Sequence, residues 1–186
     1  MLDCSRNSVM KPQKVKEFID TIKSFGYNSI MLYLEDTFEV DGEPLFGYLR
    51  GGYTKKELID IDAYAIKAGV ELIPCVQTLA HLNAIFRWQE YAEINDINDV
   101  LLVDNERTYT LIDRIFSTVC ECFTSKTINI GLDEAHMLGK GKYLDKFGFK
   151  DRFELFSTHL KRVNELAKKH GLKPLLWSDT FFEKKF

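Results

Sequence analysis

Several features that mark common classes of protein are missing from this sequence. It has no block of basic residues and a net charge of only −3, so nucleic acid is not an expected partner. No apolar run reaches the ~20 residues that a membrane-spanning helix needs. The first residues do not place an apolar stretch after a basic one, as a secretory signal would. We therefore expect a cytoplasmic protein that does not bind membranes.

The motifs of common metal and nucleotide sites are also missing. The four cysteines lack the spacing of a zinc site, and we expect them to be buried free thiols: Cys4, Cys75, Cys120 and Cys122. No glycine-rich phosphate loop follows the first predicted strand, and no His-Glu-x-x-His motif occurs. The sequence thus predicts neither a cofactor nor a bound metal.

What is present is an alternation of strand and helix signals along 186 residues, with an apolar fraction of 45% that suits one globular domain. Predicted strands cover residues 1–5, 28–34, 70–76, a stretch from Thr127 and residues 173–179. Predicted helices start at Pro12, behind a Thr54–Glu57 capping box, near Leu111 and after Asp151. A short helical piece at 84–91 precedes a polar loop through residue 104.

This alternation predicts an α/β fold with a parallel sheet covered by helices. Polar residues follow every predicted strand, which favours a (β/α)8 barrel over a doubly wound sheet. Such barrels typically need ~250 residues, so five strands in 186 residues predict an incomplete barrel. We expect residues 1–186 to form a partial catalytic domain that is inactive by itself, with missing C-terminal sequence supplying the remaining strands.

The stretch from Thr127 to His136 carries the strongest chemical signal. It begins as a run of apolar, β-branched residues, which predicts a buried strand, and it contains the adjacent carboxylates of Asp133 and Glu134. Because side chains alternate along a strand, Asp133 falls on a small polar face and Glu134 on the opposite, apolar one. We therefore expect Glu134 to join Asp133 only if the chain leaves the strand and turns.

This stretch resembles the Asp-Glu catalytic pair of glycoside hydrolase family 20, the β-N-acetylhexosaminidases. Three other segments support the resemblance in the family's order. Residues 2–6 look like the first strand, whose arginine holds the sugar, and residues 35–54 resemble the loop after strand two. Residues 77–82 lie where the family has Pro-Gly-His, of which only the histidine is present. Residues 133–148 are most similar to a bacterial subgroup that acts on terminal N-acetylglucosamine or N-acetylgalactosamine.

The resemblance implies a retaining hydrolase of terminal β-linked N-acetylhexosamines that works by substrate assistance. The substrate's own acetamide oxygen attacks the anomeric carbon and forms an oxazolinium ion. By resemblance, Glu134 donates the proton and later activates water, while Asp133 orients the acetamide and stabilises positive charge. The expected partner is a carbohydrate, and the residues expected to bind it are Arg6, His81, Trp177, Asp36 and Tyr53.

Structural interpretations of these residues stay open at this stage. A carboxylate after a strand is often the N-cap of the next helix, and Arg6 could form a surface ion pair. His81 could serve only as a hydrogen-bonding group of its loop, and Trp177 could belong to the core.

Two other functions also stay open. A metal-dependent barrel enzyme would use carboxylates and imidazoles that occur near the strand ends: His81, Asp133, Glu134, His136 and Asp179. A catalytically incomplete fragment of a hexosaminidase is the other alternative.

Overall fold

The computed structural model describes residues 1–6 and 8–179, which form a five-stranded parallel sheet. Its strands are β1 (Leu2–Asp3), β2 (Ser29–Glu35), β3 (Glu71–Val76), β6 (Thr127–Asn129) and β7 (Lys173–Leu175). They lie side by side in chain order, β1-β2-β3-β6-β7, and every pair is parallel. The five predicted strands and their parallel arrangement are therefore confirmed, although the first, fourth and last are shorter than the sequence suggested.

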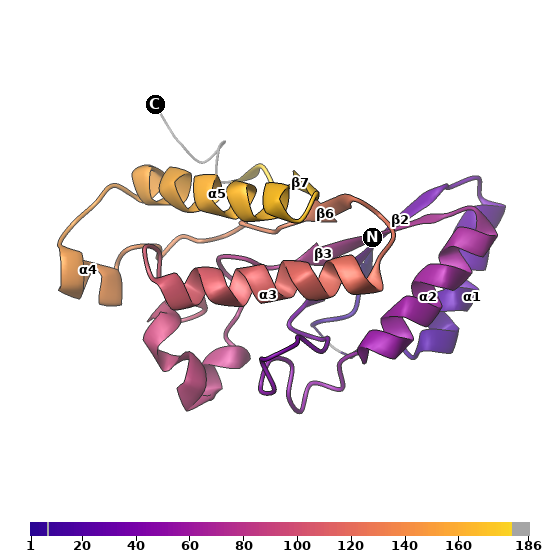
Figure 1. The fold of residues 1–186 in the computed structure, drawn as a ribbon, viewed down its shortest axis with the longest axis horizontal. Coiled ribbons are helices and arrows are strands. Elements are labelled where there is room, and N and C mark those ends of the chain that lie inside the picture. The colour runs from indigo at the N-terminus through magenta and orange to yellow at the C-terminus, as the bar shows by residue number, and fades with distance from the viewer. Residues whose placement is uncertain (7, 180–186) are drawn as a thin grey trace.

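Four long helices connect these strands and cover one face of the sheet (Figure 1). They are α1 (Pro12–Ser24), α2 (Lys55–Ala68), α3 (Glu106–Cys122) and α5 (Arg152–Lys169). Neighbouring helices pack against one another in the same order as the strands. A strand, a covering helix and the next parallel strand form the repeating unit of a (β/α)8 barrel, and right-handed connections keep all the helices on one side.

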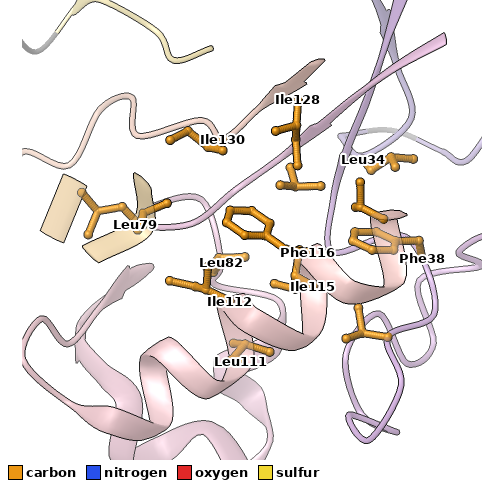
Figure 2. Packing of buried hydrophobic residues seen from close by; sticks show 14 of the residues in the cluster. Leu34, Phe38, Leu79, Leu82, Leu111, Ile112, Ile115, Phe116, Ile128 and Ile130 are labelled. Carbon is orange, nitrogen blue, oxygen red and sulfur yellow. The ribbon is translucent and has the colours of Figure 1, made fainter. Parts of the chain in front are cut away.

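Alternation along the strands separates an apolar face from a polar one. Ile30, Leu32 and Leu34 of β2 are buried in the hydrophobic core beneath the helices, whereas Tyr33 between them lies outside that cluster. In β6 and the residues after it, Ile128 and Ile130 belong to the same core and Asn129 does not. Figure 2 shows Phe116 of α3 in a cluster that includes Leu34, Ile128 and Ile130. The face opposite the helices therefore carries the polar residues.

Local signals account for where the helices begin. Thr54 and Glu57 form the predicted capping box at α2, and the Asp151 side chain accepts hydrogen bonds from the first backbone amides of α5. Pro12 occupies the first turn of α1, where a missing N–H costs little. Each of these helix starts was predicted from the sequence and is confirmed.

The segment between β3 and α3 differs from the expected helical piece and polar loop. It holds two 3-10 helices, η1 (Ile85–Arg87) and η2 (Gln89–Ile94), followed by an antiparallel pair, β4 (Asn95–Ile97) and β5 (Val100–Leu101). The four apolar residues 100–103 at its end are buried. The expectation of a polar loop was wrong because these residues pack into the core rather than facing water.

A short helix, α4 (Lys142–Phe147), follows the Asp133–Glu134 segment and was not predicted. It is held against the segment between β3 and α3 by Asp96 of β4, which accepts hydrogen bonds from the backbone amides of Gly139 and Tyr143. In the part of the chain that the structure describes, no helix combines the length and apolar character needed to cross a membrane.

Candidate active site

A polar cavity of about 570 Å³ opens beyond the carboxyl ends of the first three strands. Parallel strands bring their carboxyl ends to one edge, so residues far apart in sequence meet there. Every lining residue is polar or charged: Ser5, Arg6, Glu35, Arg50, His81, Asn83, Asn98 and Asp99. Two of the predicted site residues, Arg6 and His81, therefore line the same cavity.

Asp133 lies behind His81 and is held from two sides. Its Oδ1 accepts a hydrogen bond of 2.9 Å from Gln77 Nε2, and its Oδ2 lies 3.2 Å from His81 Nε2. Burial alone would raise the pKa of Asp133, but the contacts with His81 and Gln77 outweigh it and lower the pKa. The carboxylate is thus held in its ionised form.

Glu134 reaches the same histidine because the chain turns after β6. Gly131, Leu132 and Glu134 have positive φ angles of 74°, 73° and 54°. The Glu134 carboxylate lies 3.6 Å from His81 Nε2, and its backbone N–H donates to Asp179 Oδ2 at 3.1 Å. This confirms that Glu134 joins Asp133 by leaving the strand. The Glu134 side chain remains 63% exposed, whereas that of Asp133 is 17% exposed.

His81 is fixed by its own backbone as well as by its ring contacts. Its φ is 60°, and its backbone N–H donates to Asp99 Oδ2 at 3.0 Å. The Asp133 carboxylate beside the ring raises the pKa of His81, and the further negative charges of Glu35 and Asp99 act in the same direction. The imidazole is therefore a positively charged link between the two neighbouring carboxylates at moderately acidic pH.

Arg6 combines an ion pair with a place in the cavity. Its guanidinium lies 3.1 Å from Asp3 Oδ2 and 5.2 Å from the centre of the Tyr33 ring. Its side chain is 60% exposed, so its remaining donors face solvent at the cavity. The ion-pair interpretation and the ligand interpretation are compatible with this position.

Three other residues predicted to bind substrate do not line the cavity. Asp36 is buried and accepts a hydrogen bond of 3.1 Å from Arg50 Nε, so it holds a lining residue in place. Tyr53 is 2% exposed, and its hydroxyl donates to the backbone carbonyl of Met10. Trp177 lies beyond β7 at the same edge of the sheet, where its backbone N–H donates to Gly131 O at 3.1 Å. Direct contacts from these side chains to a sugar remain predictions.

Sequence reasoning missed several groups that complete the site. Tyr33 and Gln77 lie beneath it, while Arg50 and Asp99 line it. A signal for Tyr33 was available, because it lies two residues before Glu35 on the same face of β2. Asp99 gave no such signal, because it reaches His81 only through the turn between β4 and β5. Within the described residues, no group of three or more His, Cys, Asp or Glu side chains has the arrangement of a metal site.

A family model, "Glycosyl hydrolase family 20, catalytic domain", matches residues 1–185. The chain therefore belongs to glycosyl hydrolase family 20. Among solved structures, the chain is similar to a Streptomyces plicatus β-hexosaminidase described in complex with its product GlcNAc. The two share 26% identity with a TM-score of 0.79, over 96% of this chain and 38% of that chain.

Two further relatives extend this comparison. A GH20 exo-β-N-acetylglucosaminidase from Vibrio harveyi superposes with a TM-score of 0.85 at 19% identity, over 100% of this chain and 36% of that one, and so supports the fold. Hexosaminidase D from Bos taurus is 23% identical over 180 residues, which cover 90% of this chain and 52% of that protein. The chain thus spans between about a third and a half of the length of these relatives.

Proposed function

We propose that this chain carries the two catalytic carboxylates of a β-N-acetylhexosaminidase. The enzyme would remove terminal β-linked N-acetylglucosamine or N-acetylgalactosamine from glycans with retention of configuration. The observation that carries the proposal is the pair of adjacent carboxylates after β6, both near His81 but in different surroundings. Asp133 is hydrogen-bonded and shielded, while Glu134 is largely exposed. Membership of family 20 and the hexosaminidase relatives support it.

The different surroundings suit two different roles. Asp133, kept ionised by His81 and Gln77, would accept a hydrogen bond from the acetamide N–H and stabilise the positive charge of the oxazolinium ion. Glu134 would donate a proton to the glycosidic oxygen and then remove one from the attacking water. Because the nucleophile belongs to the substrate, the reaction needs no nucleophile from the protein. The tethered acetamide also reduces the entropy lost in reaching the transition state.

The cavity residues would hold the sugar. The free donors of Arg6 face the cavity from the end of β1 and suit sugar hydroxyl groups. Arg50 and Asp99 offer a further donor and acceptor on its walls, each held by the surrounding loops. Trp177 would pack against the acetamide methyl group or the sugar face from the end of β7.

The test compares an acetamido sugar with its C4 epimer and with a sugar that lacks the acetamide at C2. A protein containing residues 1–186 within a complete barrel is assayed with an aryl N-acetyl-β-glucosaminide, the N-acetyl-β-galactosaminide and the β-glucoside that lacks the acetamide. We expect turnover of the acetamido sugars only, and inhibition by a thiazoline that mimics the oxazoline. Asp133→Asn should lower kcat because the acetamide is misoriented. Hydrolysis of the plain glucoside at a similar rate would rule out the substrate-assisted route.

A further inference from the structure

Gln77 is a buried polar residue that contacts Asp133 but would not itself touch the substrate in the proposed reaction. It follows β3 directly, its exposed fraction is 0%, and its amide lies between β2 and the segment after β6. Its Nε2 donates at 3.0 Å to the Tyr33 hydroxyl and at 2.9 Å to Asp133 Oδ1. An amide group has two N–H bonds, so these two contacts use both of them.

These contacts fix the direction of a short hydrogen-bond chain. Because the Tyr33 oxygen accepts from Gln77, its own O–H is free to donate, and it does so to Glu35 Oε1 at 2.8 Å. The neutral pair Gln77–Tyr33 therefore presents a hydrogen to a carboxylate at each end. A carboxylate oxygen accepts the Gln77 N–H more strongly than a carboxylic acid oxygen does, so this arrangement favours the ionised form of Asp133.

The neighbouring backbone leaves room for the Gln77 amide only because residue 131 is glycine. Gly131 has a φ of +74°, and a Cβ there would lie 1.9 Å from Gln77 Oε1. That oxygen has no hydrogen-bond partner among the described residues. A buried acceptor without a partner is costly, so the orientation of the amide is set by what its N–H groups donate to.

We propose that Gln77 is a positioning residue that keeps Asp133 ionised and fixes the plane of its carboxylate, with Tyr33 as its support. The proposal rests on the proposed function for the role of Asp133. It adds the reason why one of two adjacent carboxylates is held as an anion. Gln77 donates a hydrogen bond to Asp133, and His81 Nε2 lies 3.2 Å from the same carboxylate, whereas Gln77 makes no hydrogen bond to Glu134 among the described residues.

The charges around Asp133 show why a donor is needed there. The titratable groups that face it come from β2, from β3 and the following loop, and from its own segment: Tyr33, Glu35, Cys75, His81 and Glu134. Burial favours the neutral acid of Asp133, and the carboxylates of Glu35 and Glu134 belong to the same cluster around His81. The contacts with Gln77 and His81 act against burial, and Gln77, unlike His81, is not itself titratable.

The first measurement follows the wild-type chain of residues 1–186 by NMR as pH is lowered. The Gln77 side-chain NH2 signals and the Asp133 carboxyl carbon are recorded together. We expect the amide signals to shift with the same midpoint as the Asp133 carboxyl, because one N–H loses its charged acceptor. Gln77 signals that stay constant through the Asp133 titration would overturn the proposal, and this readout needs no variant.

The second measurement changes the donor. Gln77→Met removes both N–H groups at similar volume, and the pKa of Asp133 should rise by about one unit, the contribution of one N–H bond to a carboxylate. In Gln77→Glu, the new carboxyl group can donate to Asp133 only by taking up a proton itself, so carboxyl titration in the cluster should move to higher pH. Gln13→Glu makes the same chemical change on the exposed face of α1 and should leave Asp133 unaffected.

An Asp133 pKa that is unchanged in folded Gln77→Met protein would reduce Gln77 to a packing role. If a variant fails to fold, the wild-type amide titration still decides. Neither readout depends on turnover, so the two proposals can fail separately. The expected titration, together with no hexosaminidase activity in a complete barrel containing this chain, would overturn the proposed function alone. Turnover with a Gln77 amide insensitive to Asp133 would overturn the positioning role alone.

Discussion

The two faces of the sheet are made by the same strands but are built differently. On the helix-covered face, Leu32 and Ile128 are fully buried in one apolar cluster. On the opposite face, Tyr33 leads into a polar network that ends at Asp133, and Asn129 Oδ1 accepts a hydrogen bond from the Gly131 backbone N–H. Alternation of side chains along a strand is enough to create both faces. The helix-covered face therefore provides most of the stability, and the other is available for chemistry.

The polar face contains strained backbone, which costs stability. Glu35, His81 and Glu134 all have positive φ angles, between 49° and 60°, a conformation that non-glycine residues rarely adopt. Buried polar atoms without hydrogen-bond partners also occur there, among them Gln77 Oε1 and Asp179 Oδ1. Such features cost of order 1–3 kcal/mol each and cluster at functional sites. Burial of apolar side chains on the helix-covered face offsets the free-energy cost of these features on the polar face.

The largest effect on stability is expected on the helix-covered face. Phe116 of α3 is fully buried, so Phe116→Ala should lower the free energy of unfolding by about 3–5 kcal/mol through lost burial and a cavity. Phe25→Ala removes the same ring from a site that is 74% exposed and should change stability by less than about 0.5 kcal/mol. Urea unfolding measures both, and similar losses for the two variants would contradict the core assignment.

His159 links α5 to the loop after β3. Its titration is expected to change the free energy of unfolding by about 3 kcal/mol across the acidic pH range. The imidazole is fully buried, its Nε2 lies 2.7 Å from the Thr78 carbonyl, and burial lowers its pKa to about 4. Below pH ~6.5 the unfolded chain binds a proton that the folded protein does not. The stability contribution of the neutral ring should therefore fall as pH drops from 6.5 to about 4.

Stability measured in urea at several pH values checks this expectation. His159→Gln should be less stable at neutral pH but should lose less on acidification over the same range. An equal pH dependence in the variant would show that another group is responsible.

A smaller loss of stability, about 1–3 kcal/mol in the free energy of unfolding, is expected from a substitution at Gly131 on the polar face. Gly131→Ala would place a Cβ 1.9 Å from Gln77 Oε1, so the Gln77 amide must shift, which would disturb its hydrogen bond to Asp133. Gly69→Ala is a matched control, because its φ of +76° is similar and nothing lies within 4 Å of the added carbon. Thermal unfolding gives the stability difference, and activity should fall only in Gly131→Ala. Equal behaviour of the two variants would mean that the polar face does not depend on this close approach.

The helix-covered face could be predicted from sequence because its signals are local. Pro12, the Thr54–Glu57 box and Asp151 each mark a helix start within a few residues, and apolar spacing marks the buried side. The order of five parallel strands follows from the alternation of strands and helices. The sequence also indicated that Glu134 could join Asp133 only through a turn, because alternation alone would have separated the two carboxylates.

The polar face was predicted only in part because its contacts join distant segments. Gln77 and Tyr33 are 44 residues apart, and Asp99 reaches His81 from a hairpin that has no regular apolar pattern. Tyr53 has the same sequence context as a loop residue that contacts a ligand, yet its ring packs into the core. Such pairings depend on the strand register and the loop paths, which the sequence alone does not determine.

The most direct test of the catalytic assignment compares leaving groups in Glu134→Gln. In a complete barrel containing this chain, the variant should lose about 10²- to 10⁴-fold in kcat/KM on an alkyl N-acetyl-β-glucosaminide, whose leaving group needs a proton. It should lose far less on the 2,4-dinitrophenyl glycoside, whose leaving group does not. Glu17→Gln, the same change on exposed α1, should leave both rates unaltered. Full activity of Glu134→Gln on the alkyl glycoside, or equal losses on both substrates, would contradict the assignment of Glu134 as the acid.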